Sequence, residues 1–314
     1  MLKSIIYTSE EENLLKHCRL CPRECGTNRL KGECGFCNLD SRIAIASVCN
    51  HKGEEPVVNG EKGICNVFFS HCNLQCVYCQ NYQISNRLSN VNYTSAETIV
   101  DKITAVLQES ENIVGFVSPT SQIPQMLSII RALRERNLQP LIVYNTNSYD
   151  RVEMLKRLEG TINVYLADMR YAFSDLGYSL SGVKDYPEKA IAAIKEMYRQ
   201  KGSSILTDKW DKIESGLIIR VLCLPQMQQN SMRILDLIAE NLSCNVQISL
   251  LAQYYPPFAM ADEALNHRLS QQEYAEIVNY AIDLGFSKII TQELSSADTF
   301  QPDFTKNKPF ETVL

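Results

Sequence analysis

The chain has 314 residues, of which 45% are hydrophobic, so it is long enough to bury a full core. Its 31 basic and 36 acidic side chains give a formal net charge of -5. This acidic balance, without a long basic run, argues against a nucleic-acid-binding track.

The N-terminal segment carries a first group of cysteines. Residues 1–15 contain acidic side chains and no long apolar stretch, so we expect neither a signal peptide nor a membrane span. Cys18, Cys21 and Cys25 follow in CRLCPREC, and Cys34 and Cys37 lie in KGECGFC. Paired CxxC knuckles are typical of a tetrahedral zinc site or of an additional iron–sulfur cluster, and thiolates bind both. Unligated thiols are the alternative, whereas disulfides are disfavoured in the reducing cytoplasm that we expect for this cysteine-rich chain.

Downstream of residue 62 the pattern alternates between strands and helices. Short β-prone apolar runs predict strands at residues 64–69, 113–117, 141–144, 162–167, 217–224 and 246–251. Apolar residues at helical spacing predict helices at residues 94–107, 123–136, 150–158, 187–201, 230–241 and 270–284, the first opened by a capping box at Thr94 and Glu97. This α/β order predicts a parallel sheet with crossover helices, in the form of a partial (βα)6 TIM-like barrel.

We divide the chain into three parts. Residues 1–62 form a cysteine-rich module that ends in a polar linker at 50–62, residues 63–295 form the partial barrel, and residues 296–314 form a C-terminal tail. A polar insertion at residues 203–215 precedes a strand, and we therefore expect it on the face away from the active site.

The most informative feature is a loop with three thiols. Cys72, Cys76 and Cys79 lie in SHCNLQCVYCQ, directly after the strand predicted at residues 64–69. A cubane iron–sulfur cluster normally takes four thiolates, so three leave one iron open to an outside molecule. The alternatives are three buried cysteines without a metal, or a zinc site with His71 as the fourth ligand. The polar and turn-forming neighbours favour a loop at the end of a strand, where such barrels gather their chemistry.

This loop resembles the signature of radical S-adenosylmethionine (SAM) enzymes, in which an aromatic residue, here Tyr78, precedes the last cysteine of CxxxCxxC. The run CNLQCVYCQN is most similar to the pyruvate formate-lyase activating enzymes. The stretches FVSPTSQIPQ, VYNTNSYD, YLADMRY and LLAQYYP resemble a narrower branch, the PflX-like homologues of those enzymes. The resemblance runs from about residue 18 to 286, and it implies a radical SAM barrel with a small N-terminal metal-binding module.

The resemblance also implies which residues contact the cofactor. The candidates are Tyr78, Ser118, Thr120, Asn145, Thr146, Asp168, Arg170 and Arg220. Asn145 replaces an acidic residue of the activating enzymes, which weakens a cation site, and Arg170 replaces a lysine, which turns a point charge into a planar fork. Ser118, Pro119 and Thr120 stand where many of these enzymes have GGE, which receives the amino group of SAM.

Two further predictions, for Arg220 and for the N-terminal cysteines, combine the sequence pattern with the resemblance. Arg220 interrupts the apolar run LIIRVLCLP, so it is expected to face a polar interior or a ligand, or to pair with a buried acid such as Asp168. In the PflX-like branch, the elements CxLCPRxC and GExGxC make the following cysteines the first choice for the N-terminal metal, with Cys34 as the spare: Cys18, Cys21, Cys25 and Cys37.

The function implied by the resemblance is reductive cleavage of SAM at a [4Fe-4S] cluster. A flavodoxin or ferredoxin would reduce the cluster, and the resulting 5'-deoxyadenosyl radical would remove hydrogen from a substrate. In the activating enzymes this substrate is a glycine of a partner protein, so a protein substrate is the leading hypothesis. The alternatives are a small-molecule substrate or another peptide modification, and, outside catalysis, an iron–sulfur electron carrier or metal-bound scaffold. We expect no nucleic-acid or membrane partner.

Overall fold

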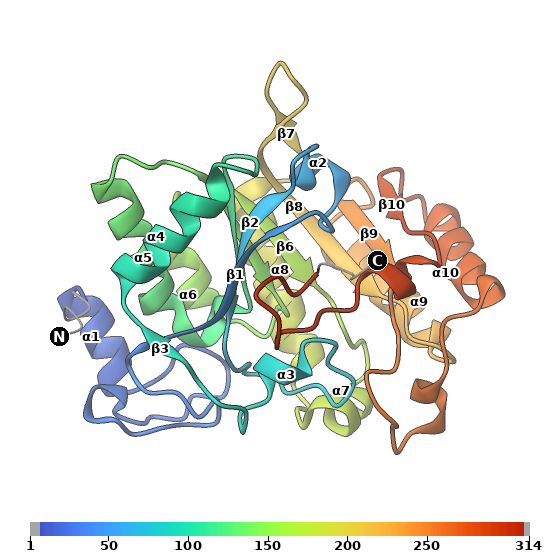
Figure 1. Cartoon of the computed structure of the whole chain (residues 1–314). Coiled ribbons are helices and arrows are strands. Elements are labelled where there is room, and N and C mark those ends of the chain that lie inside the picture. Colours follow the sequence, from blue (N-terminus) through green and yellow to red (C-terminus); the bar gives the residue numbers. More distant parts are fainter. Residues whose placement is uncertain (1–6, 311–314) are drawn as a thin grey trace.

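A computed structural model describes residues 7–310 of the chain. One sheet runs through the molecule in the order β10-β9-β8-β6-β5-β4-β2-β1-β3, and β7 pairs with β8 (Figure 1). The strands are β1 (Ile43–His51), β2 (Ile64–Phe69), β3 (Tyr93–Thr94), β4 (Ile113–Val117), β5 (Leu141–Thr146), β6 (Val164–Asp168), β7 (Leu206–Thr207), β8 (Ile213–Leu222), β9 (Gln247–Leu251) and β10 (Ile289–Thr291). From β2 to β10 the neighbours along this path are parallel, whereas β1 is antiparallel to both β2 and β3.

Helices connect the parallel strands, and those with long apolar faces pack on the outside of the sheet. The helices are α1 (Ser9–Lys16), α2 (Pro56–Asn59), α3 (Tyr82–Ser85), α4 (Ala96–Leu107), α5 (Ile123–Glu135), α6 (Val152–Arg157), α7 (Ser174–Ser181), α8 (Tyr186–Lys201), α9 (Gln228–Asn241), α10 (Gln271–Asp283) and α11 (Ser296–Thr299). Short 3-10 turns lie at Arg29–Lys31, Pro119–Gln122 and Glu263–Asn266. Within the described range, no helix is both long enough and apolar enough to cross a bilayer.

The predicted α/β class with a parallel sheet is confirmed, and a cysteine-rich segment precedes the sheet. Each of the six predicted strands coincides with one of β2, β4, β5, β6, β8 and β9. The structure adds β10 at one edge and β1 followed by β3 at the other, so part of residues 1–62 belongs to the same sheet as the barrel strands. The start of α4 also differs in detail, because Ser95 caps it by accepting a hydrogen bond from the amide of Thr98.

Inside the barrel, side chains of neighbouring strands form an apolar layer and, two residues further along each strand, a polar layer. Val143, Leu166 and Ile218 belong to one buried apolar cluster, which Val58 of α2 closes from the β1–β2 connection. Side chains two residues apart on a strand point to the same face. The residues two positions later, Asn145, Asp168 and Arg220, are polar and line a cavity. The barrel interior therefore changes from apolar to polar toward the carboxyl ends of its strands.

The C-terminal segment crosses the open side of the barrel and returns toward β1 and β2 (Figure 1). Phe304 and Phe310 pack on Phe68 of β2, with ring centroids 5.2 and 5.6 Å away. Phe310 also lies 4.2 Å from the ring of His51. The β7–β8 hairpin projects from the opposite end of the molecule from α3, and it exposes 70% of Trp210.

Candidate functional site

The loop after β2 is held in a defined shape by its own polar side chains. Its backbone takes left-handed conformations at His71 (φ 62) and Gln75 (φ 64). The Gln75 amide donates to the carbonyls of Cys72 (2.9 Å) and Ser85 (2.6 Å). The buried Asn73 amide donates to the carbonyl of Tyr149 at 2.8 Å, which ties the loop to the segment after β5. The loop is therefore anchored on both sides of the three cysteines.

The thiols of Cys72, Cys76 and Cys79 lie near one another at the carboxyl ends of the strands. Burial, together with the neighbouring Cys76 and Cys72, raises the pKa of the Cys79 thiol to about 11. Burial also raises the pKa of Cys72, which the amide of Leu74 and the charge of Arg170 lower. Without a positive partner these thiols would stay protonated, so the set suits a metal centre that stabilises thiolates.

Two amides already point at the sulfur of Cys72. The backbone N–H of Leu74 donates to it at 3.4 Å, and the side-chain N–H of Asn147 donates at 3.2 Å. Hydrogen bonds of this kind favour the thiolate form. Asn147 was not among the predicted site residues, although it directly follows Asn145 and Thr146 in the run that was singled out.

A cavity of about 410 Å³ opens beside this loop. Several sequence-predicted residues line it, namely Tyr78, Cys79, Ser118, Asn145, Asp168, Arg170 and Arg220. Ser118 takes a left-handed backbone conformation (φ 57) and donates its amide to the carbonyl of Asn145 at 2.9 Å. The structure thus brings residues of the predicted second, third, fourth and fifth strands to one cavity.

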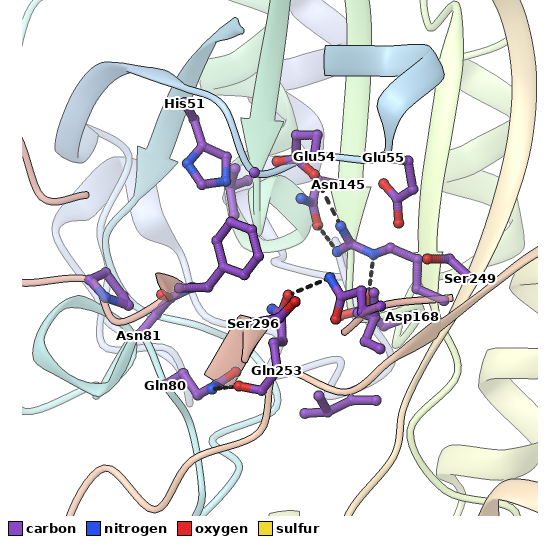
Figure 2. A pocket seen from close by; sticks show the side chains of 18 of the residues that line it. His51, Glu54, Glu55, Gln80, Asn81, Asn145, Asp168, Ser249, Gln253 and Ser296 are labelled. Carbon is purple, nitrogen blue, oxygen red and sulfur yellow. Dashed lines mark hydrogen bonds and ion pairs between the residues drawn. The ribbon is translucent and has the colours of Figure 1, made fainter. Parts of the chain in front are cut away.

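Arg220 is the centre of the charge network in this cavity. Its side chain is 12% exposed, and its Nε lies 2.7 Å from Asp168 Oδ1. The other guanidinium nitrogens donate to Asn145 Oδ1 at 2.6 Å and to Glu54 Oε2 at 3.2 Å. Figure 2 shows Glu54, Asn145 and Asp168 converging on this point. Asp168 also accepts a hydrogen bond from Arg170 at 2.6 Å. Arg220 thus faces a polar interior and also forms the salt bridge with Asp168 that was predicted as the alternative.

Several buried polar atoms at the cavity have no hydrogen-bond partner within residues 7–310. They are His51 Nδ1, Glu55 Oε2, Arg170 Nε and Ser249 Oγ. Burial raises the pKa of Glu55, with Arg220 acting against this shift and Glu54 adding to it. Unsatisfied buried polar groups are unfavourable unless a ligand or water meets them. The cavity is therefore suited to a polar ligand.

Glu54, Glu55 and His51 belong to the stretch that we expected to contain a linker, and they were not predicted as site residues. The connection between β1 and β2 folds into the barrel, where Glu54 also accepts from Asn66 of β2 at 2.8 Å. The run HKGEEP has no spacing signal that would have identified it.

Thr120 and Thr146 face away from the cavity. Their hydroxyls lie 3.3 Å apart in a buried cluster with Tyr144 and Asp150. The Thr146 hydroxyl donates to Asp150, and the Tyr144 hydroxyl donates to the same carboxyl at 2.8 Å. These two threonines support the end of β5 and do not line the cavity with Asn145.

Asp150 makes the stability of the fold depend on pH. Burial raises its pKa above the ordinary 3.8, while the hydroxyls of Thr146 and Tyr144 act against the shift. The folded carboxyl therefore keeps its proton at pH values where the unfolded one has lost it, and stability falls as pH rises from 3.8 through the folded pKa. We expect Asp150→Asn to flatten this fall in urea unfolding measured over a pH series. The exposed Asp283→Asn is the control, and an equal change of slope in both variants would contradict the assignment.

The N-terminal cysteines form a second group. Cys18, Cys21, Cys25 and Cys37 line one small cavity, whereas Cys34 is exposed outside it. In the part of the chain that the structure describes, no three histidine, cysteine, aspartate or glutamate side chains are already gathered closely enough to ligate one ion.

Comparisons with known proteins agree with this arrangement. Residues 66–208 match the family model of the radical SAM superfamily. An uncharacterized protein of Methanocaldococcus jannaschii is 29% identical over 281 residues, which cover 86% of this chain and 75% of that protein.

Among solved structures, a radical SAM methyltransferase from Sphaerobacter thermophilus superposes with a TM-score of 0.52 and 14% identity, over 73% of this chain. This chain covers 66% of that structure, slightly less than two thirds, so the likeness concerns the fold. The match begins within β2 and includes the three-cysteine loop and the strands that carry Asn145 and Asp168. Residues 66–208, slightly less than half of the chain, are thus similar to the radical SAM superfamily, whose members use a [4Fe-4S] cluster and SAM.

Proposed function

We propose that Cys72, Cys76 and Cys79 hold a [4Fe-4S] cluster and that the cavity beside them binds SAM. The observation that carries the proposal is the position of three half-buried cysteines of one short loop beside a polar cavity of about 410 Å³. A cubane places each thiolate on a different iron, so three thiolates leave one iron for the cofactor. Residues 63–295 would form the catalytic unit, to which the N-terminal residue Glu54 adds a cavity contact.

Four predicted residues would contact SAM, and two others, Asp168 and Tyr78, would support the site. Arg170 and Arg220 offer cationic donors toward its carboxylate, and Asp168 keeps both side chains extended toward the cavity. Asn145, already bound to Arg220, presents an amide, and Ser118 adds a hydroxyl in place of the missing GGE. Tyr78 is buried beside Tyr171 and Tyr254, with centroids 6.4 and 6.2 Å away, and limits water near the last cysteine.

With a cluster held by these cysteines, the site would supply the electron for reductive cleavage of SAM; the residues of the chain would orient the cofactor and exclude water. The C-terminal segment contributes to exclusion, because Ser296, Phe300 and Phe310 line the cavity from its open side. The reductant we propose is a flavodoxin or ferredoxin in a reducing cytoplasm, under the oxygen-free conditions that an open cluster requires.

The substrate we propose is a polypeptide, with activation of a glycyl-radical enzyme as the leading case. The support is the resemblance of the cysteine loop to the activating enzymes and the way in which the cavity opens at the open side of the barrel. The chain's own segment from α11 to Phe310 lies across this opening in largely irregular backbone. An opening that accommodates this segment offers room for a loop of another protein once the segment moves.

Isotope transfer tests both the cleavage of SAM and the polypeptide substrate. The protein is reconstituted without oxygen and given dithionite, SAM and extract of cells grown on glycine deuterated at Cα, separated into macromolecular and small-molecule fractions. We expect 5'-deoxyadenosine to form and to gain deuterium only with the protein fraction. Stimulation and deuterium transfer by the small-molecule fraction alone would contradict the polypeptide substrate. An intact cluster that never cleaves SAM would contradict the enzyme and favour the electron carrier.

A further inference from the structure

Four cysteines of the N-terminal module line one small cavity, although their side chains are not yet close enough together to ligate one ion. Cys18, Cys21, Cys25 and Cys37 surround a cavity whose centre has about 10 Å³ of free space, which is room for one atom-sized guest. A cubane cluster contains eight iron and sulfur atoms and would need far more room. The fifth cysteine of the module, Cys34, does not line this cavity; it is exposed, as Cys25 also is, and its sulfur lies 3.8 Å from the carbonyl of Gly32. The fold thus separates four cysteines from the spare one.

Backbone amides are directed at three of these sulfurs. The N–H of Phe36 donates to Cys25 Sγ at 3.2 Å. Backbone hydrogen bonds from Arg23 and Leu39 are directed at the sulfurs of Cys21 and Cys37. The turn leaves no space for a side chain at position 35, because a Cβ on Gly35 would lie 2.8 Å from the sulfur of Cys25. Amide-to-sulfur bonds in tight knuckles are the arrangement that stabilises thiolate ligands.

A buried positive charge lies beside the same cavity without an acidic partner. Arg29 is 1% exposed and lines the cavity. Its guanidinium donates to the main-chain carbonyls of Asp40 (2.6 and 3.0 Å) and Ser121 (2.6 Å), and within residues 7–310 it forms no ion pair. A buried charge is unfavourable unless an opposite charge compensates it. Protonated thiols provide none, whereas four thiolates around one divalent ion carry a net charge of about -2.

We propose that Cys18, Cys21, Cys25 and Cys37 bind one zinc ion and that this site positions the cluster loop through Arg23. Zinc prefers four thiolates in tetrahedral geometry, and about 10 Å³ of free space at the centre of the cavity suits a single ion. Binding draws the four sulfurs together by side-chain rotation and releases their protons. This inference goes beyond the proposed function, because a structural zinc site does not depend on SAM cleavage.

Arg23 links the two cysteine groups. It lies between Cys21 and Cys25, and its guanidinium stacks 3.6 Å from the ring centroid of Phe36. From there it donates to the carbonyls of Asn73 (3.1 Å) and Leu74 (3.4 Å), which belong to the loop between Cys72 and Cys76. A ring nitrogen of His71 also contacts the carbonyl of Cys37 at 2.9 Å. An ordered knuckle therefore fixes the backbone that carries the cluster cysteines, and Arg23 is a positioning residue.

Metal content tests the zinc site. The full-length protein is prepared without oxygen, and zinc and iron are measured per chain for the wild type, Cys21→Ser, Cys34→Ser and Cys76→Ala. We expect one zinc in the wild type, Cys34→Ser and Cys76→Ala, and none in Cys21→Ser. Zinc retained in Cys21→Ser, zinc lost in Cys34→Ser, or iron instead of zinc in Cys76→Ala would overturn the site.

Cobalt substitution keeps the test valid if Cys21→Ser does not fold. Cobalt(II) added to metal-free Cys76→Ala should show the intense visible bands and sulfur-to-cobalt charge transfer of a tetrahedral four-thiolate site. Weak bands of an octahedral ion, or no binding, would overturn the proposal. Because Cys76→Ala lacks a cluster ligand, neither result depends on SAM chemistry.

The positioning role of Arg23 is tested by how firmly the cluster is held. We expect Arg23→Met to keep its zinc and its reconstituted iron, but to lose the iron to a chelator roughly tenfold faster than the wild type, as for other outer-shell changes at metal sites. Arg19→Met, an exposed arginine of the same module, is the control. Equal rates of iron loss in Arg23→Met and the wild type would contradict the link.

Discussion

Replacing Cys76 with alanine should abolish both the iron–sulfur cluster and the cleavage of SAM. Two thiolates cannot hold a cubane with one open iron, since the cluster needs three protein ligands when SAM takes the remaining corner. The expected result is loss of the visible absorption and of the electron paramagnetic resonance signal of the reduced cluster. No 5'-deoxyadenosine should appear with dithionite and SAM.

The matched control is Cys244→Ala. Cys244 is also half-buried, and its sulfur contacts the carbonyl of Leu284 at 3.3 Å, away from the cysteine loop. This variant should keep its cluster and its rate of cleavage. A Cys76→Ala protein that retained a SAM-cleaving cluster would rule out the assigned ligand set, and equal loss in both variants would point to general damage.

Replacing Arg220 with methionine should destabilise the fold by about 3–5 kcal/mol, the cost typical of breaking a buried ion pair from one side. The substitution removes the cation that contacts Asp168 at 2.7 Å and Glu54 at 3.2 Å. Burial raises the pKa of the nearby Glu55 carboxyl, and the charge of Arg220 lowers it. The free energy of unfolding in urea measures the effect, and SAM affinity should fall in the protein that remains folded.

Arg233→Met makes the same change at the surface. Arg233 is 38% exposed and pairs with Glu240 at 2.7 Å, where solvent screens the attraction. The expected loss is about 0–1 kcal/mol. Arg220→Lys is the conservative variant, and it should recover part of the stability because it keeps the charge but loses the planar fork. If Arg220→Met were no less stable than Arg233→Met, the network would not be an important element of the fold.

The sequence by itself determined the elements whose signals are local. The alternation of apolar runs and helical periods predicted β2, β4, β5, β6, β8 and β9, because each strand is a short buried stretch bounded by turns. The close spacing of Cys72, Cys76 and Cys79 after a strand singled out the loop. The strand ends at Asn145 and Asp168 were predicted to meet, since parallel strands gather their carboxyl ends at one edge.

Only the tertiary structure decided contacts between segments that are distant in the chain. Glu54 meets Arg220 across 166 positions, because the β1–β2 connection folds into the barrel. Thr146 and Asn145 are adjacent in sequence, yet only Asn145 lines the cavity, because neighbouring residues of a strand face opposite sides. Packing also determines which four of the five N-terminal cysteines line one cavity. Arg23 contributes to this packing, because it binds the loop that carries the cluster cysteines. Local spacing identifies residues that can act together. The direction of each side chain and the contacts between distant segments determine which of these residues meet.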